Sequence, residues 1–181
     1  MYPPPFYPLA PPLSPGGRPL AEFGVRLLAW LIDSAILTGA TLVVAVPAVI
    51  AVFTTQLRPD LENANLNGTV FPGRFFAAIL LLEGGIALFA ILLRYVYEVE
   101  MMYRSGQTVG KRVMKLQVIP IDPAQRLTRG SATVRFLVSG VVGAVVPMFS
   151  LLDGLWQLWD KPFLQTLHDK AAQTVVIKLF P

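Results

Sequence analysis

The chain has 181 residues, of which 54% are hydrophobic and only 14% are charged, with a formal net charge of +4. Soluble domains carry about 25% charged residues, so this composition and the long uncharged runs predict one small membrane domain. Cysteine is absent and His168 is the only histidine. This excludes disulfides, thiolate catalysis, cysteine-ligated metals and a histidine-rich metal site within one chain.

Residues 1–24 form a proline-rich segment in which eight of the first 19 residues are proline. Proline fixes φ and has no N–H to donate, so we expect an extended, solvated and disordered tail. The PxxP spacings in this segment also fit a docking peptide for a binder of proline-rich sequences. The tail interpretation is favoured on composition.

The first predicted membrane span covers residues 25–53. Ser34–Gln56 contains 23 residues without a charge, more than the ~20 that a crossing helix needs. Arg26 and Asp33 are seven residues apart, nearly two helical turns, and therefore share a face. An ionised side chain inside a membrane costs about 2.5–3.5 kcal/mol and usually has a partner. The pair therefore indicates a site or a helix-packing face.

The polar residues 54–74 predict a loop, and residues 75–96 predict a second span. Glu83 lies in the middle of that span beside Gly84 and Gly85. Two interpretations stay open for Glu83. It is a ligand for a proton or cation, or it is a buried hydrogen-bonding group that joins helices, for example in a pair with Arg26.

Residues 98–130 form a basic segment. The positive-inside rule places it in the cytoplasm, with the N-terminus on the same side and residues 54–74 outside. Basic residues beside a membrane attract anionic headgroups, and we favour this over a ligand site. Gly106–Lys111 does not match a phosphate-binding loop, because three residues rather than four separate its glycines.

A third apolar stretch, Phe136–Leu152, has 17 residues without charge and is interrupted by Pro147. A single crossing would place the lysine-bearing C-terminal segment outside, which disagrees with the charge rule. A bent or re-entrant segment that turns near Gly143–Pro147 returns the C-terminus to the cytoplasm, and we favour this topology. Asp153 follows the stretch directly.

The C-terminal residues 174–180 predict a short strand because of their β-branched run, and it could pair with residues 115–121. His168 and Asp169 precede this strand. Neither serine nor cysteine accompanies them in the segment, so we expect a capping or structural role rather than catalysis.

Three blocks, Arg26–Asp33, Gly106–Arg112 and Thr166–Val176, together resemble the RDD family of small membrane proteins, named for an arginine and two aspartates. The resemblance covers roughly residues 22–178. The resemblance implies that Arg26 is the arginine of the family name and that Asp33 is its first aspartate. The second aspartate is either Asp153 or Asp169. Gln173 replaces a glycine usual in the family. The resemblance implies transport of ions or unidentified ligands, and cation/proton exchange has been proposed for some members.

These observations predict an all-α helical membrane bundle, with about three membrane segments and short cytoplasmic β strands. The domain covers residues 25–178 after a tail over residues 1–24. We expect a multi-pass protein of the plasma (cell inner) membrane whose partners are anionic lipids and further copies or a larger complex, not nucleic acid. We expect no cofactor and no enzyme activity.

Two functions fit the sequence, namely a cation or proton transport subunit and an accessory or scaffold subunit. The candidate functional residues are Arg26, Asp33, Glu83, Asp153, His168 and Asp169.

Overall fold

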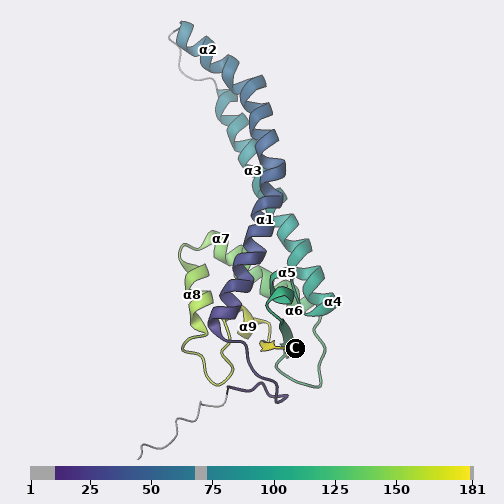
Figure 1. Ribbon diagram of the computed structural model, residues 1–181. Coiled ribbons are helices and arrows are strands. Elements are labelled where there is room, and N and C mark those ends of the chain that lie inside the picture. Colours follow the sequence, from purple (N-terminus) through teal and green to yellow (C-terminus); the bar gives the residue numbers. More distant parts are fainter. Residues whose placement is uncertain (1–10, 68–72, 180–181) are drawn as a thin grey trace, which may run out of the picture. The chain divides into compact units, whose positions relative to one another are not determined.

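The computed structural model describes residues 11–67 and 73–179, and it divides into two compact units (Figure 1). The described residues between 33 and 96 form one unit, called the hairpin unit here. The described residues between 11 and 32 and between 97 and 179 form the other, called the sheet unit. Each unit is described by itself.

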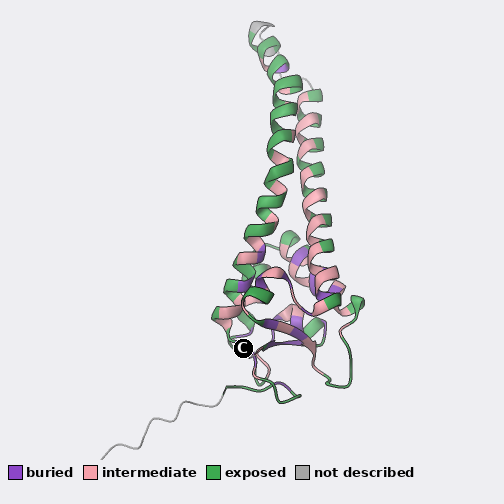
Figure 2. Cartoon of the chain, turned by 45° about the vertical axis from the view of Figure 1, so that its right-hand side comes forward, coloured by how far each residue is buried: buried purple, intermediate pink, exposed green. Residues whose placement is uncertain are grey.

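The hairpin unit consists mainly of two long apolar helices. Helix α1 (Phe23–Val52) begins in the sheet unit and continues into the hairpin unit. Helix α3 (Gly73–Tyr95) lies beside it within the hairpin unit in both views (Figures 1 and 2). Both helices are long and apolar enough to cross a membrane. Most of their side chains are exposed or half-buried, as Figure 2 shows, so lipid or other protein must cover them.

The loop predicted over residues 54–74 is wrong for most of its length, because the helix continues through η1 (Phe53–Leu57) and α2 (Arg58–Asn67). In η1, a π-helical turn, the hydroxyls of Thr54 and Thr55 donate to backbone carbonyls one turn earlier, so these polar residues do not interrupt the helix. In α2, Arg58 pairs with Glu62 at 2.9 Å, which supports the helix at i,i+4 spacing. Residues 68–72 lie outside the described residues.

The second long helix continues past α3 as η2 (Val96–Glu100) and α4 (Met101–Ser105). Gly106 ends it in the left-handed conformation with φ 69°, which glycine adopts without steric cost. Thr108 then begins α5 (Val109–Val113) as its N-cap. Gly106 and Thr108 are therefore helix stop and start signals.

The predicted pairing of the two short strands is confirmed. Strand β1 (Leu116–Pro120) pairs antiparallel with β2 (Thr174–Lys178), in the register that places Leu116 opposite Lys178. Gln173, at the position where the resemblance leads us to expect glycine, adopts φ 52° just before β2. The tight turn is therefore retained without glycine.

The N-terminal segment differs from the solvated tail predicted over residues 1–24. Leu20 forms a β-bridge with Ile177, and Ala21 N–H donates to the Val176 carbonyl at 2.9 Å. Leu20 and Ala21 are both buried. The reason is that these residues supply hydrogen bonds and apolar cover to the outer edge of β2, which would otherwise be open. Residues 1–10 lie outside the described residues.

The third apolar stretch is broken into short helices. A continuous helical run comprises α6 (Arg129–Phe136), η3 (Leu137–Val142) and α7 (Gly143–Val145), and α8 (Phe149–Trp156) follows a break. Val146 is extended, as the residue before a proline prefers to be, and Met148 has φ 64°. Among the described residues only the two helices named above reach membrane-spanning length, so a third full span is not found.

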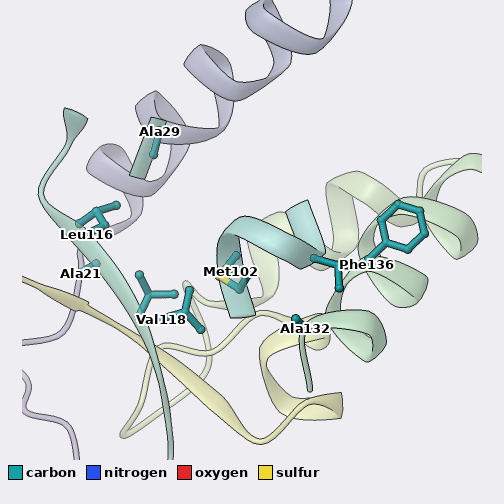
Figure 3. Packing of buried hydrophobic residues seen from close by; sticks show 9 residues of the cluster. Ala21, Ala29, Met102, Leu116, Val118, Ala132 and Phe136 are labelled. Atoms are coloured by element: carbon teal, nitrogen blue, oxygen red, sulfur yellow. The ribbon is translucent and has the colours of Figure 1, made fainter. Parts of the chain in front are cut away.

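The apolar core of the sheet unit lies between the sheet and the surrounding helices (Figure 3). Leu116 and Val118 of β1 contribute to it together with Met102 of α4 and Phe136 of α6. Ala21 and Ala29 add small side chains from the start of the chain. This core packs the beginning of α1, α6 and β2 together, and these elements carry Arg26, Arg135 and Thr174 of the charged site described next.

Candidate functional site

Asp169 is the centre of a buried charged cluster in the sheet unit. It lies in α9 (Leu167–Ala171), a short helix that begins with a capping box. The Thr166 hydroxyl accepts from Asp169 N–H at 3.2 Å, and the Asp169 carboxylate accepts from Thr166 N–H at 3.1 Å. The side chain of Asp169 is 0% exposed. The capping box therefore fixes where this carboxylate points.

Two arginines bind the Asp169 carboxylate from different helices. Arg26 of α1 donates to Oδ2, and Arg135 of α6 donates to Oδ1. Arg26 also donates to the Leu164 carbonyl at 2.8 Å, and Arg135 also donates to the Thr174 hydroxyl. Both guanidinium groups are largely buried. Asp169 and its two arginines thus join α1, α6 and the start of β2.

The charge state of Asp169 follows from these contacts. Burial by itself would raise the pKa of this carboxyl, but Arg135 and Arg26 outweigh burial and hold the pKa well below its usual range. Asp169 is therefore ionised at neutral pH. Removing one partner of such a buried pair costs about 3–5 kcal/mol, because the remaining charges stay uncompensated.

A second acid, Asp153 of α8, joins the cluster through His168. Asp153 accepts from His168 N–H at 2.9 Å, and its other oxygen lies 2.6 Å from Nδ1 of the imidazole. Nε2 of His168 lies 3.6 Å from Asp169. Burial, followed by the positive charge of Arg135, lowers the pKa of His168. The imidazole is therefore neutral at pH 7, and we assign the Nδ1 proton to the bond with Asp153.

A smaller network secures the chain between α8 and α9. Asp160 accepts from Gln165 N–H at 2.9 Å and forms an ion pair with Lys170. The Gln165 side-chain amide donates to the Thr174 carbonyl at 2.8 Å. These bonds hold the loop that carries the capping box against the beginning of β2.

The cluster brings together four of the six residues singled out from the sequence, namely Arg26, Asp153, His168 and Asp169. The other two, Asp33 and Glu83, belong to the hairpin unit. Asp33 is 7% exposed, whereas Glu83 is exposed midway along α3. Both aspartates considered for the last letter of the family name lie in the cluster, and Asp169 is the one that binds Arg26.

The sequence does not single out Arg135, because an arginine that follows a basic segment and precedes an apolar run is typical of a membrane-flanking charge. The available signal was its place in α6, one residue before the apolar run begins and four before Ser139. In the structure Arg135 is buried and its backbone carbonyl accepts from Ser139. Thr166 and Thr174 were also missed as partners, although the spacing from Thr166 to Asp169 is that of a capping box.

The cluster contains two guanidinium groups and two carboxylates, so its formal charges balance when the imidazole is neutral. It contains no serine or cysteine beside His168 to serve as a nucleophile. Within the described ranges, no group of three or more His, Cys, Asp or Glu side chains is placed to hold a metal ion. The arrangement can hold α1, α6 and the segment from α9 to β2 together, and the charge of the cluster changes when His168 is protonated.

The chain belongs to the RDD family, because the model of that family matches residues 20–173. The match includes every member of the charged cluster except Thr174. No significant match was found among curated proteins or among solved structures. Family membership and two apolar helices of spanning length together give the chain the character of a membrane domain.

Proposed function

We propose that this protein is a subunit of an oligomeric membrane transporter that moves a proton or a monovalent cation. The observation that carries the proposal is Glu83, an ionisable side chain that is exposed in the middle of apolar helix α3. Facing lipid, an ionised carboxylate would cost about 2.5–3.5 kcal/mol or more. In the membrane Glu83 therefore needs cover from another protein surface or from water.

That cover is not supplied within the part of the chain that the structure describes. Glu83 makes no side-chain hydrogen bond or ion pair with any described residue. Gly84 and Gly85 follow it, and a Cβ added to either would meet nothing within 4 Å. Small residues allow a neighbouring helix to approach closely. A second copy of α3 placed against this surface would shield Glu83 from lipid.

The proposed transport chemistry uses carboxylates within the spans. A carboxylate in a water-lined path between subunits can exchange a bound proton for a cation. Asp33 on α1 is the second candidate carboxylate, and it is buried. Arg26 was considered from sequence as the charge partner of both. Its guanidinium binds Asp169 and the Leu164 carbonyl, so we now assign Arg26 to holding the sheet unit together.

Topology is part of the proposal. Strands β1 and β2 pair directly, so residues 116–120 and 174–178 must lie on one side of the membrane. This supports a third stretch that bends back, as the break at Val146–Met148 allows. The basic residues of the sheet unit support a cytoplasmic location for it at the plasma membrane, with the N-terminus and C-terminus on the same side.

The test is flux through the purified full-length protein in liposomes, followed with pH-sensitive and Na⁺-sensitive dyes. We expect E83Q to reduce flux at least about tenfold, because it removes the exchangeable charge but keeps the size. E62Q is the matched control, since Glu62 is an exposed carboxylate of α2. Equal flux in E83Q and wild type would contradict a carboxylate pathway. D33N tests the second carboxylate in the same assay.

An accessory or scaffold role in a larger membrane complex is the second candidate, without transport or enzyme activity of its own. It is favoured by the buried cluster, in which Arg26, Arg135 and Asp169 are engaged with one another. The proline-rich N-terminus would then be a docking peptide for a partner. Co-purification in mild detergent should yield stoichiometric partners in that case. A homo-oligomer without partners, active in the flux assay, would exclude it.

A further inference from the structure

A groove beside strand β1 is distinct from the buried cluster and from Glu83. It has a volume of about 530 Å³ and lies wholly within the sheet unit. Its walls come from the end of α4, from β1 and from the loop before α6. Tyr103, Ile119, Pro120 and Leu127 make one part of the lining apolar, and Arg104 and Arg126 bring positive charge.

The charge around this groove is not balanced. Arg104 and Arg129 both pair with the single carboxylate of Glu100, at 2.6 and 3.3 Å. The Arg129 guanidinium also lies 4.7 Å from the centre of the Tyr103 ring. Arg126 is exposed and makes no side-chain hydrogen bond or ion pair with any described residue. Arg104 and Arg129 therefore share the Glu100 carboxylate, whereas Arg126 has no carboxylate partner among the described residues.

We propose that this groove binds a phosphate group attached to an apolar body. Guanidinium groups recognise phosphate through paired, charge-assisted hydrogen bonds, and Arg126 is available to make them. Tyr103, Ile119 and Leu127 provide an adjoining apolar surface for the rest of the ligand. The phosphate comes from a phospholipid headgroup or from a soluble organic phosphate, and both sources share this chemistry. The proposal is independent of transport through Glu83.

Glu100 allows the proposal to be tested by a substitution that should increase the affinity for phosphate. Its carboxylate competes with any anion for Arg104 and Arg129. Replacing it with glutamine frees both guanidinium groups, so the E100Q variant should bind phosphate more tightly. A gain of affinity cannot arise from misfolding. Arg112 supplies the matched control, because it is an exposed arginine of the same basic segment that does not line the groove.

The experiment uses the full-length protein in an uncharged detergent, with dihexanoyl phosphatidylglycerol as the probe and dihexanoyl phosphatidylcholine as the zwitterionic comparison. Affinity is read from titrations followed by thermal shift. Phosphatidylglycerol should bind wild type and R112Q similarly and R126Q about tenfold more weakly, and E100Q should bind it several-fold more tightly. Equal affinities of R126Q and R112Q for phosphatidylglycerol would overturn the proposal, because the guanidinium group of the groove would then not bind the phosphate.

Competition with inorganic phosphate distinguishes the two sources. Displacement of the lipid by inorganic phosphate at concentrations similar to those of the lipid supports a soluble organic phosphate as the ligand. Retention of the lipid under excess inorganic phosphate supports a phospholipid headgroup, because the glycerol and acyl parts then contribute to binding. Both outcomes support the phosphate site, provided that R126Q weakens binding and R112Q does not.

Discussion

Arg26 and Asp169 are 143 residues apart in sequence and form a direct ion pair in the folded chain. The pair connects the beginning of the first long helix to the short helix that precedes the last strand. Arg135 completes the arrangement from α6. Arg26 and Asp169 thus join positions near the two ends of the stretch that the family model matches.

Loss of the Asp169 charge should destabilise the fold strongly. The D169N variant keeps the shape of the side chain but leaves Arg26 and Arg135 without a counter-ion, at a cost of about 3–5 kcal/mol. The free energy of unfolding in detergent measures this effect. The exposed control variant E62Q should change it by less than about 1 kcal/mol. A D169N variant as stable as E62Q would mean that the pair is not needed for stability.

The geometry of Arg135 should matter as well as its charge. Arg135 donates to both Asp169 and Thr174 from one guanidinium nitrogen, Nη1. The ammonium of lysine sits on a shorter side chain and is more strongly hydrated, so it is less suited to this buried position. We expect R135K to lower the free energy of unfolding by about 1–3 kcal/mol, the range for a lost hydrogen bond to a charged group. R112K, at an exposed position, serves as the control. Equal effects of the two substitutions would argue against a geometric role for Arg135.

Stability should fall as the pH drops from about 7 to 5. The folded protein holds the pKa of His168 below its ordinary value of 6.5, so the unfolded chain takes up the proton first and is favoured by acid. The H168N variant keeps a donor near the Nδ1 position but cannot titrate. Its thermal midpoint should therefore vary less over this pH range than that of wild type. Parallel profiles would show that His168 does not set the dependence.

Below about pH 4 wild type and the H168N variant should both lose further stability. The pKa of Asp169 in the folded protein lies well below its ordinary value of 3.8, so the unfolded state again binds a proton more readily. The same series of thermal midpoints, extended to lower pH, measures this second decline. D169N should lack the part that comes from this carboxyl.

Backbone conformation at Gly106 should be required for the sheet unit. Its φ is 69°, and a Cβ at this position would come within 2.6 Å of the Val118 carbonyl oxygen. We expect G106A to destabilise the protein by at least about 1–2 kcal/mol. G130A is a suitable control, because an added Cβ there meets its nearest atom at 3.6 Å. Comparable stability of both variants would contradict the close approach of Gly106 to β1.

Short sequence patterns predicted much of the fold, whereas most contacts between residues far apart in the sequence could not be predicted from them. The apolar runs predicted α1 and α3, and the β-branched run at residues 174–178 predicted β2 and its pairing with β1. The burial of Arg135 was not predicted, because a buried arginine and a membrane-flanking arginine have the same sequence pattern. Its role depends on Asp169 and Thr174, more than 30 residues away.

Two further differences have similar causes. Residues 54–67 are polar but helical, because hydroxyl-to-carbonyl bonds and an i,i+4 ion pair replace the apolar contacts of a typical helix. Pro12, Pro19 and their neighbours look like a solvated tail, yet this segment pairs with the open edge of β2. Only the completed sheet creates that edge, so composition alone gives no indication of it.

The central claim is that another copy of the protein covers the Glu83 face of α3 in the membrane. The native chain has no cysteine, so single-cysteine variants can be cross-linked without background. Ala87 lies one turn after Glu83 on the same face, and Leu92 lies on the opposite face by helical geometry. Cross-linking in native membranes should give A87C dimers in high yield and L92C dimers in lower yield. An A87C variant that remains monomeric would contradict the claim.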